Sequence, residues 1–341
     1  SAEHGDGLPD LLEALRAAFA GLERDRAPSG ETETAGEPDE PAETIPDGDE
    51  TAPSVEDEAA GPAPLRVLRL AVVGRPNVGK SSLINRLIRQ ERLLTGPEPG
   101  LTRDSVPIAW EWQGQRVELV DTAGLRRKGR IEAAIEKLSA SATVRAIRRA
   151  HVVLLVVDAA EPLEHQDTTI ANLALAEGRA LLVVANKSDL VPDVGAALKA
   201  LRERAADRLA QVRGVPCVAV SARTGRGLAA LPEAVLDLAR RWQSRVPTGA
   251  LNRWLAEVID RHPPPLVQNR RLKFRYMTQT ATRPPTFVLF ANKPAEAVPD
   301  SYLRYLAGQL RTSFDLEGVP LRLQVRHGAN PYDRGGSAER G

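Results

Sequence analysis

Residues 74–81 have the composition and spacing of a loop that binds phosphate groups. The segment Gly74-Arg-Pro-Asn-Val-Gly-Lys-Ser81 follows the apolar run 67–73, typical of a buried strand, and precedes a helix-like apolar pattern over 83–88. Glycines let main-chain N–H groups converge on phosphate oxygens, and the start of the helix adds positive partial charge. Lys80 would reach the terminal phosphates as a catalytic residue, and the Ser81 hydroxyl would bind Mg²⁺. The predicted phosphate-binding residues are Gly74, Asn77, Val78, Gly79, Lys80, Ser81 and Ser82.

A second polar element follows another strand-like segment. Asp121-Thr-Ala-Gly124 comes directly after residues 116–120. A carboxylate at the end of a strand can hold Mg²⁺ through water, and a glycine N–H can face the terminal phosphate of a nucleotide. Asp121 is therefore a predicted magnesium ligand, and Gly124 is a predicted catalytic residue that acts through its main chain.

Two later elements have the chemistry needed to bind a nucleotide base. Asn186-Lys-Ser-Asp189 follows the apolar run 180–185, and Ser221-Ala222 follows the run 215–220. The carboxylate of Asp189 offers two acceptors that match the N1–H and the exocyclic amine of guanine, whereas adenine has no such pair of donors. The predicted guanine-binding residues are Asn186, Lys187, Asp189, Ser221 and Ala222.

These four elements, in this order, resemble the G boxes of the translation-factor-related GTPases. The runs Gly74–Ser81 and Asp121–Arg130 and the segment Ser1–Gly5 resemble more closely the Der (EngA) family of bacterial GTPases. Members of that family have two tandem G domains and a C-terminal KH-like domain. The resemblance implies that the chain binds GTP and GDP and hydrolyses GTP with Mg²⁺. It also implies a role in maturation of the large (50S) ribosomal subunit, with this subunit or its rRNA as a partner.

The resemblance also implies which residues carry hydrolysis. Thr102 matches the switch threonine that contacts Mg²⁺ and the terminal phosphate, although Leu101 stands where the family usually has threonine. Leu125 follows Gly124 and cannot orient water through a side-chain hydrogen bond. Main-chain groups, another residue or a partner must therefore place the water. In GTPases with asparagine at the position of Asn77, the resemblance implies that this residue helps to bind K⁺, which would stabilise the transition state electrostatically. The alternative is that Asn77 is a turn residue. We expect slow hydrolysis stimulated by K⁺.

The pattern of apolar runs predicts the fold around these motifs. Residues 67–243 alternate strand-like runs with helix-like patterns. This predicts an α/β P-loop NTPase fold, a Ras-like G domain with a mostly parallel sheet, over residues 65–245. The single cysteine, Cys217, excludes an intramolecular disulfide framework and lies in a strand pattern that predicts burial. No apolar stretch reaches about 18 residues, so we expect no transmembrane helix, no membrane partner and a cytoplasmic location.

The part of the chain after the G domain predicts a second, smaller domain over residues 246–330. Its pattern is helix 251–261, strand 272–279, strand 286–291, helix 301–314 and strand 320–325. This α+β order resembles the KH-like domain of the Der family, and we expect contacts between it and the G domain. No G-x-x-G occurs in the domain, which argues against capture of single-stranded RNA by the usual KH loop.

The basic residues of this smaller domain form an alternating set. Arg271, Lys273 and Arg275, with Arg270 beside them, are expected to share one strand face that could meet rRNA phosphates. The alternative is a solvated face or an interface with the G domain. After residue 330 we expect a flexible tail over 331–341.

The amino-terminal part of the chain differs in composition from the rest. Residues 31–60 contain 12 acidic residues and no lysine or arginine, which predicts a disordered acidic linker over 28–64. The pattern S-A-x-x-G-x-G-L occurs at residues 1–8 and again at 221–228. This repeat predicts that residues 1–27 are the C-terminal remnant of an upstream G domain.

Two other functions are compatible with the sequence. The chain could be a nucleotide-sensing binding module with negligible hydrolysis, because no glutamine follows Gly124. It could also be an Era-like GTPase, which likewise has a G domain followed by a KH domain. The missing G-x-x-G and the segment before the linker argue against this last interpretation.

Overall fold

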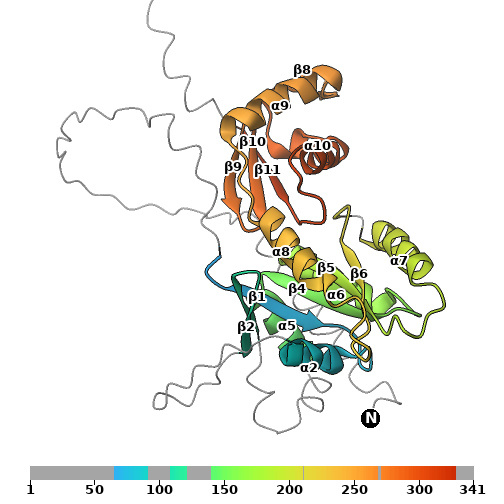
Figure 1. Cartoon of the computed structure of the whole chain (residues 1–341). Coiled ribbons are helices and arrows are strands. Elements are labelled where there is room, and N and C mark those ends of the chain that lie inside the picture. The colour runs from blue at the N-terminus through green and yellow to red at the C-terminus, as the bar shows by residue number, and fades with distance from the viewer. Residues whose placement is uncertain (1–64, 91–107, 121–139, 210, 268–269, 328–341) are drawn as a thin grey trace, which may run out of the picture.

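The computed structural model describes residues 65–90, 108–120, 140–209, 211–267 and 270–327. Its strands form a large sheet, a small sheet and a two-stranded ribbon, and Figure 1 shows the large and the small sheet at opposite ends of the molecule. The predicted segments 1–27, 28–64 and 331–341 lie outside the described residues. Within the described ranges, no helix combines the length and the apolar character needed to cross a membrane.

The large sheet is mostly parallel, as the sequence predicts. Its strands lie in the order β2-β3-β1-β4-β5-β6, and only the β2–β3 pair is antiparallel. The first strand therefore lies inside the sheet, between β3 and β4, and the loop that follows it leaves the carboxyl edge where the strand order reverses. The elements are β1 (Leu68–Val73), α2 (Lys80–Gln90), β2 (Ile108–Trp112), β3 (Gln115–Leu119), α5 (Ala140–Arg149), β4 (Val152–Asp158), α6 (His165–Ala176), β5 (Ala180–Asn186), α7 (Val194–Arg208), β6 (Cys217–Ala219) and α8 (Ala230–Trp242).

Helices cover both faces of this sheet, which explains the composition of its strands. β4 and β5 have the sequences VVLLVVD and ALLVVAN and are buried along almost their whole length, because both faces are covered. One core packs α2 and α8 on the sheet, and the other packs α5, α6 and α7 on the opposite face. Cys217 lies in the second core, and burial raises the pKa of its thiol to about 11. The predicted buried role of this cysteine is thus confirmed.

The small sheet has the predicted α-β-β-α-β order. Its strands are arranged β11-β10-β9, with β10 parallel to β11 and antiparallel to β9. Apolar side chains from α9 and α10 pack on one face of the sheet and form a third core around Phe287 and Leu289. The elements are α9 (Thr248–Arg261), β7 (Leu266–Val267), β8 (Arg270–Arg271), β9 (Phe274–Thr282), β10 (Pro285–Ala291), the 3-10 helix η2 (Ala295–Ala297), α10 (Asp300–Ser313) and β11 (Arg322–His327).

The predicted basic strand face of this domain is divided between two strands, so its assignment to one strand is wrong. Arg271 lies in the short β7–β8 ribbon, which the sequence pattern did not predict, and Arg275 lies in β9. Lys273 lies between the two strands, where its main-chain N–H donates to the Oδ1 of Asn292 at 2.8 Å. The three side chains therefore do not belong to one strand. All three side chains are exposed and Leu272 between them is buried, so the alternation of exposure continues across the break between β8 and β9.

The two sheets are joined by direct contacts far from the phosphate loop. The main-chain N–H of Gly318 donates to the carbonyl of Arg213 at 2.8 Å, and Arg311 of α10 donates to the carbonyl of Gln211 at 3.0 Å. Residues 211–216 precede β6, so this contact lies at the amino ends of the parallel strands. The loops that contain the predicted motifs after β1, β5 and β6 leave from the opposite, carboxyl edge.

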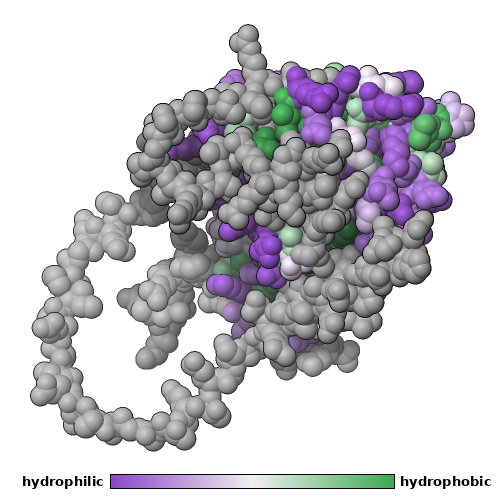
Figure 2. Space-filling model, turned by 90° about the horizontal axis from the view of Figure 1, so that it is seen from below, coloured by the Kyte–Doolittle hydropathy of each residue, from purple (hydrophilic) through white to green (hydrophobic). Residues whose placement is uncertain are grey.

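The face drawn in Figure 2, which looks at the molecule from below the view of Figure 1, is mainly hydrophilic over its described residues. Figure 2 shows hydrophilic side chains over most of its coloured area, with small separate hydrophobic areas. Among the large hydrophobic residues described, Leu190 and Leu266 are exposed, by 63% and 64%. The apolar faces of the helices pack in the three cores, and the coloured part of this one face has no extended apolar area.

His151, at the amino end of β4, should make stability depend on pH. It accepts the main-chain N–H of Arg69 at 3.2 Å, and its ring lies 5.5 Å from that of Trp242. Burial, helped by neighbouring arginine charges, lowers the pKa of His151 from 6.5 to about 4. The unfolded chain therefore binds a proton that the folded chain excludes between these values. The contribution of the buried, neutral His151 ring to stability is complete above pH 6.5 and is lost as the pH falls towards 4.

We expect the free energy of unfolding to fall across this range by at most about 1.4 kcal/mol per pH unit, the limit for one proton. Urea titrations at several pH values measure this slope. His151→Gln keeps an acceptor for Arg69 and should show a smaller slope. Identical slopes for the two proteins would contradict the assignment.

Candidate nucleotide-binding site

The loop between β1 and α2 has the backbone of a phosphate-binding loop. Its residues Gly74, Asn77 and Gly79 have positive φ angles of 145°, 61° and 88°. A Cβ on Gly74 would lie 2.2 Å from the carbonyl oxygen of Val156 in β4, and one on Gly79 would lie 2.4 Å from the Nδ2 of Asn186. Both glycines are therefore required by the close approach of neighbouring strands as well as by the turn itself. Asparagine at position 77 fits its left-handed backbone.

The first turn of α2 places two polar side chains beside this loop. Lys80 and Ser81 are buried, and the Nζ of Lys80 donates to the carbonyl of Arg75 at 2.6 Å. The first turn contains no acidic residue, so its N–H groups and the lysine present positive charge. Ser82 is exposed and Val78 is buried. This arrangement can bind the phosphates of a nucleotide.

Of the predicted magnesium ligands, Ser81 lies in the described ranges, and its hydroxyl suits the ion. It is a hard oxygen donor in the helix turn that faces the phosphates, and Mg²⁺ is usually held by few protein ligands together with phosphate oxygens and water. No cluster of three or more His, Cys, Asp or Glu side chains that could hold a metal occurs in the described ranges. The other predicted ligands, Thr102 and Asp121, and the predicted catalytic Gly124 lie outside them.

Asn186 holds the phosphate loop and the last loop of the site together. It ends β5 and is 2% exposed. Its Nδ2 donates to the carbonyl of Val78 at 2.9 Å, and its Oδ1 accepts the N–H of Ala222 at 3.0 Å. Both ends of the side chain are thus used within the protein. Asn186 therefore fixes the phosphate loop relative to the loop at Ala222, a role in addition to the base contact that the sequence predicts.

The carboxylate of Asp189, the predicted guanine-binding group, is held at both oxygens by neighbouring side chains. Its Oδ1 accepts the hydroxyl of Ser221 at 2.6 Å, and its Oδ2 accepts the guanidinium of Arg223 at 2.6 Å. The hydrogen bond from Ser221, together with Arg223, lowers the pKa of Asp189, so the carboxylate is charged at neutral pH. Each oxygen has a second lone pair available for a base donor. The predicted neighbours Asp189, Ser221 and Ala222 are therefore brought together.

Two further residues of the site did not emerge from the sequence pattern. Arg223, whose side chain is 76% exposed, forms the ion pair with Asp189 just described. Asp158, at the end of β4, accepts the Nζ of Lys187 at 2.8 Å. Although burial opposes the effect, this hydrogen bond lowers the pKa of Asp158. An acidic residue at the end of a buried strand, the feature that identified Asp121, was the available signal for Asp158.

The fold and the site define a P-loop nucleotide-binding protein of the GTPase class. Residues 69–187 match the family described as "50S ribosome-binding GTPase". Residues 245–326 match the family described as "KH-domain-like of EngA bacterial GTPase enzymes, C-terminal". The first match covers the large sheet up to the end of β5, and the second covers the small sheet. The elements α7, β6 and α8 lie between the two matches.

Whole-chain relatives give the particular family. The chain is 49% identical over 333 residues to GTPase Der of Mesorhizobium japonicum, covering 97% of this chain and 68% of that protein. It is 49% identical over 332 residues to GTPase Der of Azorhizobium caulinodans, covering 97% and 67%. The chain belongs to the GTPase Der (EngA) family and is a GTP-binding GTPase. The resemblance predicted from the motifs is thereby confirmed.

Among solved structures, the chain is similar to Era in complex with MgGDPNP and nucleotides 1506-1542 of 16S ribosomal RNA. The two are 20% identical, with a TM-score of 0.37, over 77% of this chain and 93% of that one.

Proposed function

We propose that this protein is a GTP-driven switch that hydrolyses GTP slowly and acts in the cytoplasm in assembly of the large ribosomal subunit. The observation that carries the proposal is that Lys80 and Ser81 follow β1 while Asp189 and Ser221 follow β5 and β6, at the same carboxyl edge of the sheet, and that Asn186 joins their loops. The first pair is suited to a magnesium-bound triphosphate, and the second pair is suited to guanine.

Each residue of the proposed site has a defined task in GTP hydrolysis. Lys80 and the N–H groups of the loop stabilise the charge that develops on the phosphate oxygens. Mg²⁺, when it is held by Ser81, neutralises further charge on the same oxygens. Asp189 and Ser221 fix the base and thereby the position of the phosphates. Thr102, Asp121 and Gly124 are proposed to complete the metal site and the contact with the terminal phosphate.

The ribosome is proposed as the partner on the basis of both family matches. The description of the first names 50S ribosome binding, and the second is a KH-like domain. The small sheet also has a basic edge, because β11 carries exposed Arg322 and Arg326 and has no acidic residue. Positive side chains of this kind suit rRNA phosphates.

Sedimentation through sucrose tests this partner directly. The protein is mixed with purified 50S subunits in the presence of a non-hydrolysable GTP analogue or of GDP. We expect it to sediment with the subunit in the first case and much less in the second, because the terminal phosphate orders the switch segments. A protein that binds both nucleotides and stays at the top of both gradients would contradict the ribosomal role.

Potassium should accelerate GTP hydrolysis if Asn77 helps to hold it. We expect the turnover in K⁺ to exceed that in Na⁺ by about tenfold or more, because a cation beside the phosphates stabilises the charge of the transition state. Phosphate release in matched KCl and NaCl buffers measures the ratio. Asn77→Gly is the informative variant, since glycine accepts the φ of 61° and lacks the side-chain ligand. Equal rates in both salts would remove the cation role from Asn77.

A further inference from the structure

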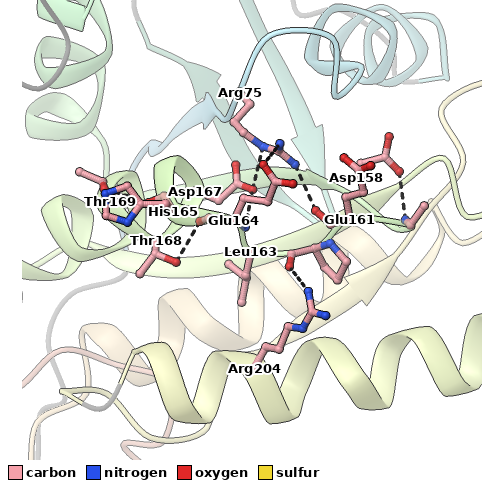
Figure 3. A network of polar contacts seen from close by, with 12 residues as sticks. Arg75, Asp158, Glu161, Leu163, Glu164, His165, Asp167, Thr168, Thr169 and Arg204 are labelled. Atoms are coloured by element: carbon pink, nitrogen blue, oxygen red, sulfur yellow. Dashed lines mark hydrogen bonds and ion pairs between the residues drawn. The ribbon is translucent and has the colours of Figure 1, made fainter. Parts of the chain in front are cut away.

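Arg75, the second residue of the phosphate loop, is held by three acceptors from one distant segment. Its Nε donates to the Oδ2 of Asp167 at 3.0 Å, and its Nη2 donates to the carbonyl of Glu161 at 3.1 Å. Its Nη1 forms an ion pair with the carboxylate of Glu164. Figure 3 shows the guanidinium between these groups, at the start of α6. The planar fork of arginine is suited to several acceptors at once, which an ammonium group cannot reproduce.

The main partner of Arg75 is a fully buried carboxylate. The side chain of Asp167 is 0% exposed and that of Arg75 is 16% exposed. Asp167 also belongs to the capping box of α6, because its Oδ2 accepts the main-chain N–H of Glu164 at 3.1 Å. Burial raises the pKa of Asp167, and the positive charge of Arg75 opposes this shift. A buried charge of this kind depends on its partner, so the guanidinium is fixed in place.

The main chain of Arg75 faces the nucleotide side of the same loop. Its carbonyl accepts the Nζ of Lys80 at 2.6 Å. The residue that α6 holds through its side chain therefore sets the position of the lysine that binds phosphate. Segment 158–167 also reaches the base-binding loop at its other end, where Asp158 accepts the Nζ of Lys187.

From this geometry we infer that Arg75 is a positioning residue for nucleotide binding, which acts through Asp167 and Glu164 of α6 to hold the phosphate loop in its binding conformation. The inference rests on the proposed function, since it assigns a further residue to the same site. A surface ion pair would contribute little, but this pair is desolvated, has three acceptors and is attached to the loop that must be rigid.

The test is the dissociation constant for GDP, measured by calorimetry on the whole chain and on a set of variants. Arg75→Ala and Asp167→Asn should each weaken GDP binding by about tenfold to a hundredfold, the cost of a small displacement of a positioned group. Arg75→Lys should not restore the affinity, because it keeps the charge but loses the fork. The double variant Arg75→Ala with Asp167→Asn should bind no more weakly than Arg75→Ala, because both changes break one interaction.

The matched control is Glu203→Gln. It removes an exposed acidic charge from α7, outside the contacts of Arg75. Its affinity for GDP should be unchanged. Thermal unfolding without nucleotide separates positioning from stability, because a purely structural ion pair would lower the unfolding temperature and leave the affinity of the folded protein unchanged.

Three results would overturn the inference. The first is an unchanged GDP affinity in Arg75→Lys, the variant in which a charge still faces Asp167 and folding is least at risk. The second is additive losses in the double variant, which would mean that the two residues act separately. The third is failure of the unsubstituted protein to bind GDP, which would overturn the proposed function as well; the first two leave that function standing.

Discussion

Replacement of Asp189 by asparagine is expected to convert a guanine-specific site into one that prefers xanthine. The carboxylate has two acceptors for the N1–H and the exocyclic amine of guanine, whereas the asparagine amide has one acceptor and one donor. The amide NH₂ of asparagine faces the exocyclic amine of guanine, and neither group finds an acceptor because both are donors. In xanthine a carbonyl stands at that position and accepts the donor. A site built on such hydrogen bonds loses affinity for the wrong ligand by about a thousandfold or more.

The surroundings of Asp189 make this substitution a clean test. Ser221 donates to the Oδ1 of Asp189, and an amide oxygen in the same place accepts the same hydroxyl. The ion pair with Arg223 is lost, but Arg223 is mostly exposed and a pair of this kind contributes little to folding. Affinities for GDP and XDP are measured by competition against one fluorescent nucleotide.

Arg223→Ala serves as the control for the lost ion pair. It removes the same pair while leaving the carboxylate, so it should retain the preference for guanine. Unchanged affinity of Asp189→Asn for GDP would mean that the base is read elsewhere, and the assignment of this loop would be wrong.

The sequence could predict the loops of this site because each depends on local spacing. The glycines at 74 and 79 and the lysine at 80 form one contiguous motif, and the apolar runs before each loop identify buried strands. Since the carboxyl ends of parallel strands meet at one edge, the motifs had to converge once the sheet was parallel. The structure confirms this part of the prediction.

The tasks of single residues inside the site could not be predicted in the same way. Asn186 is 108 residues from Val78, and Arg75 is 92 residues from Asp167. Local periodicity contains no information about pairs so far apart, because a pairing of this length exists only after the sheet has formed. Arg75 and Asp167 are each ordinary polar residues in the sequence and acquire a role only through their contact.

The wrong assignment of the basic residues of the small domain to one strand has a related cause. Alternation of side chains predicts a face only within one uninterrupted strand. The break between β8 and β9 separates Arg271 from Arg275, and the pairing of β9 with β10 shifts its register between Phe290 and Ala291. Sequence alternation alone does not show where such irregularities occur.

Replacement of Lys80 by alanine is expected to abolish most GTP hydrolysis while the fold is retained. Lys80 is the first residue of α2, and alanine is the residue most favourable in a helix. The variant loses the ammonium group beside the carbonyl of Arg75, in a buried place where a charge acts strongly on phosphate oxygens. Loss of one such electrostatic contact costs about a hundredfold to a thousandfold in rate.

Phosphate release in a single turnover, at saturating GTP, measures this rate without the effect on affinity. The control is Lys199→Ala, which removes an exposed lysine from the middle of α7. A rate equal to that of the control would contradict the assignment of Lys80.

The Asp189 and Lys80 variants together separate recognition from chemistry. Asp189→Asn should hydrolyse XTP at the rate at which the unsubstituted protein hydrolyses GTP, because only the base contact has changed. Addition of Lys80→Ala to that variant should remove XTP hydrolysis by the same factor as it removes GTP hydrolysis. The two effects should combine independently, since Lys80 bonds within the phosphate loop, Asp189 bonds to Ser221 and Arg223, and Asn186, which joins the two loops, is unchanged in both variants.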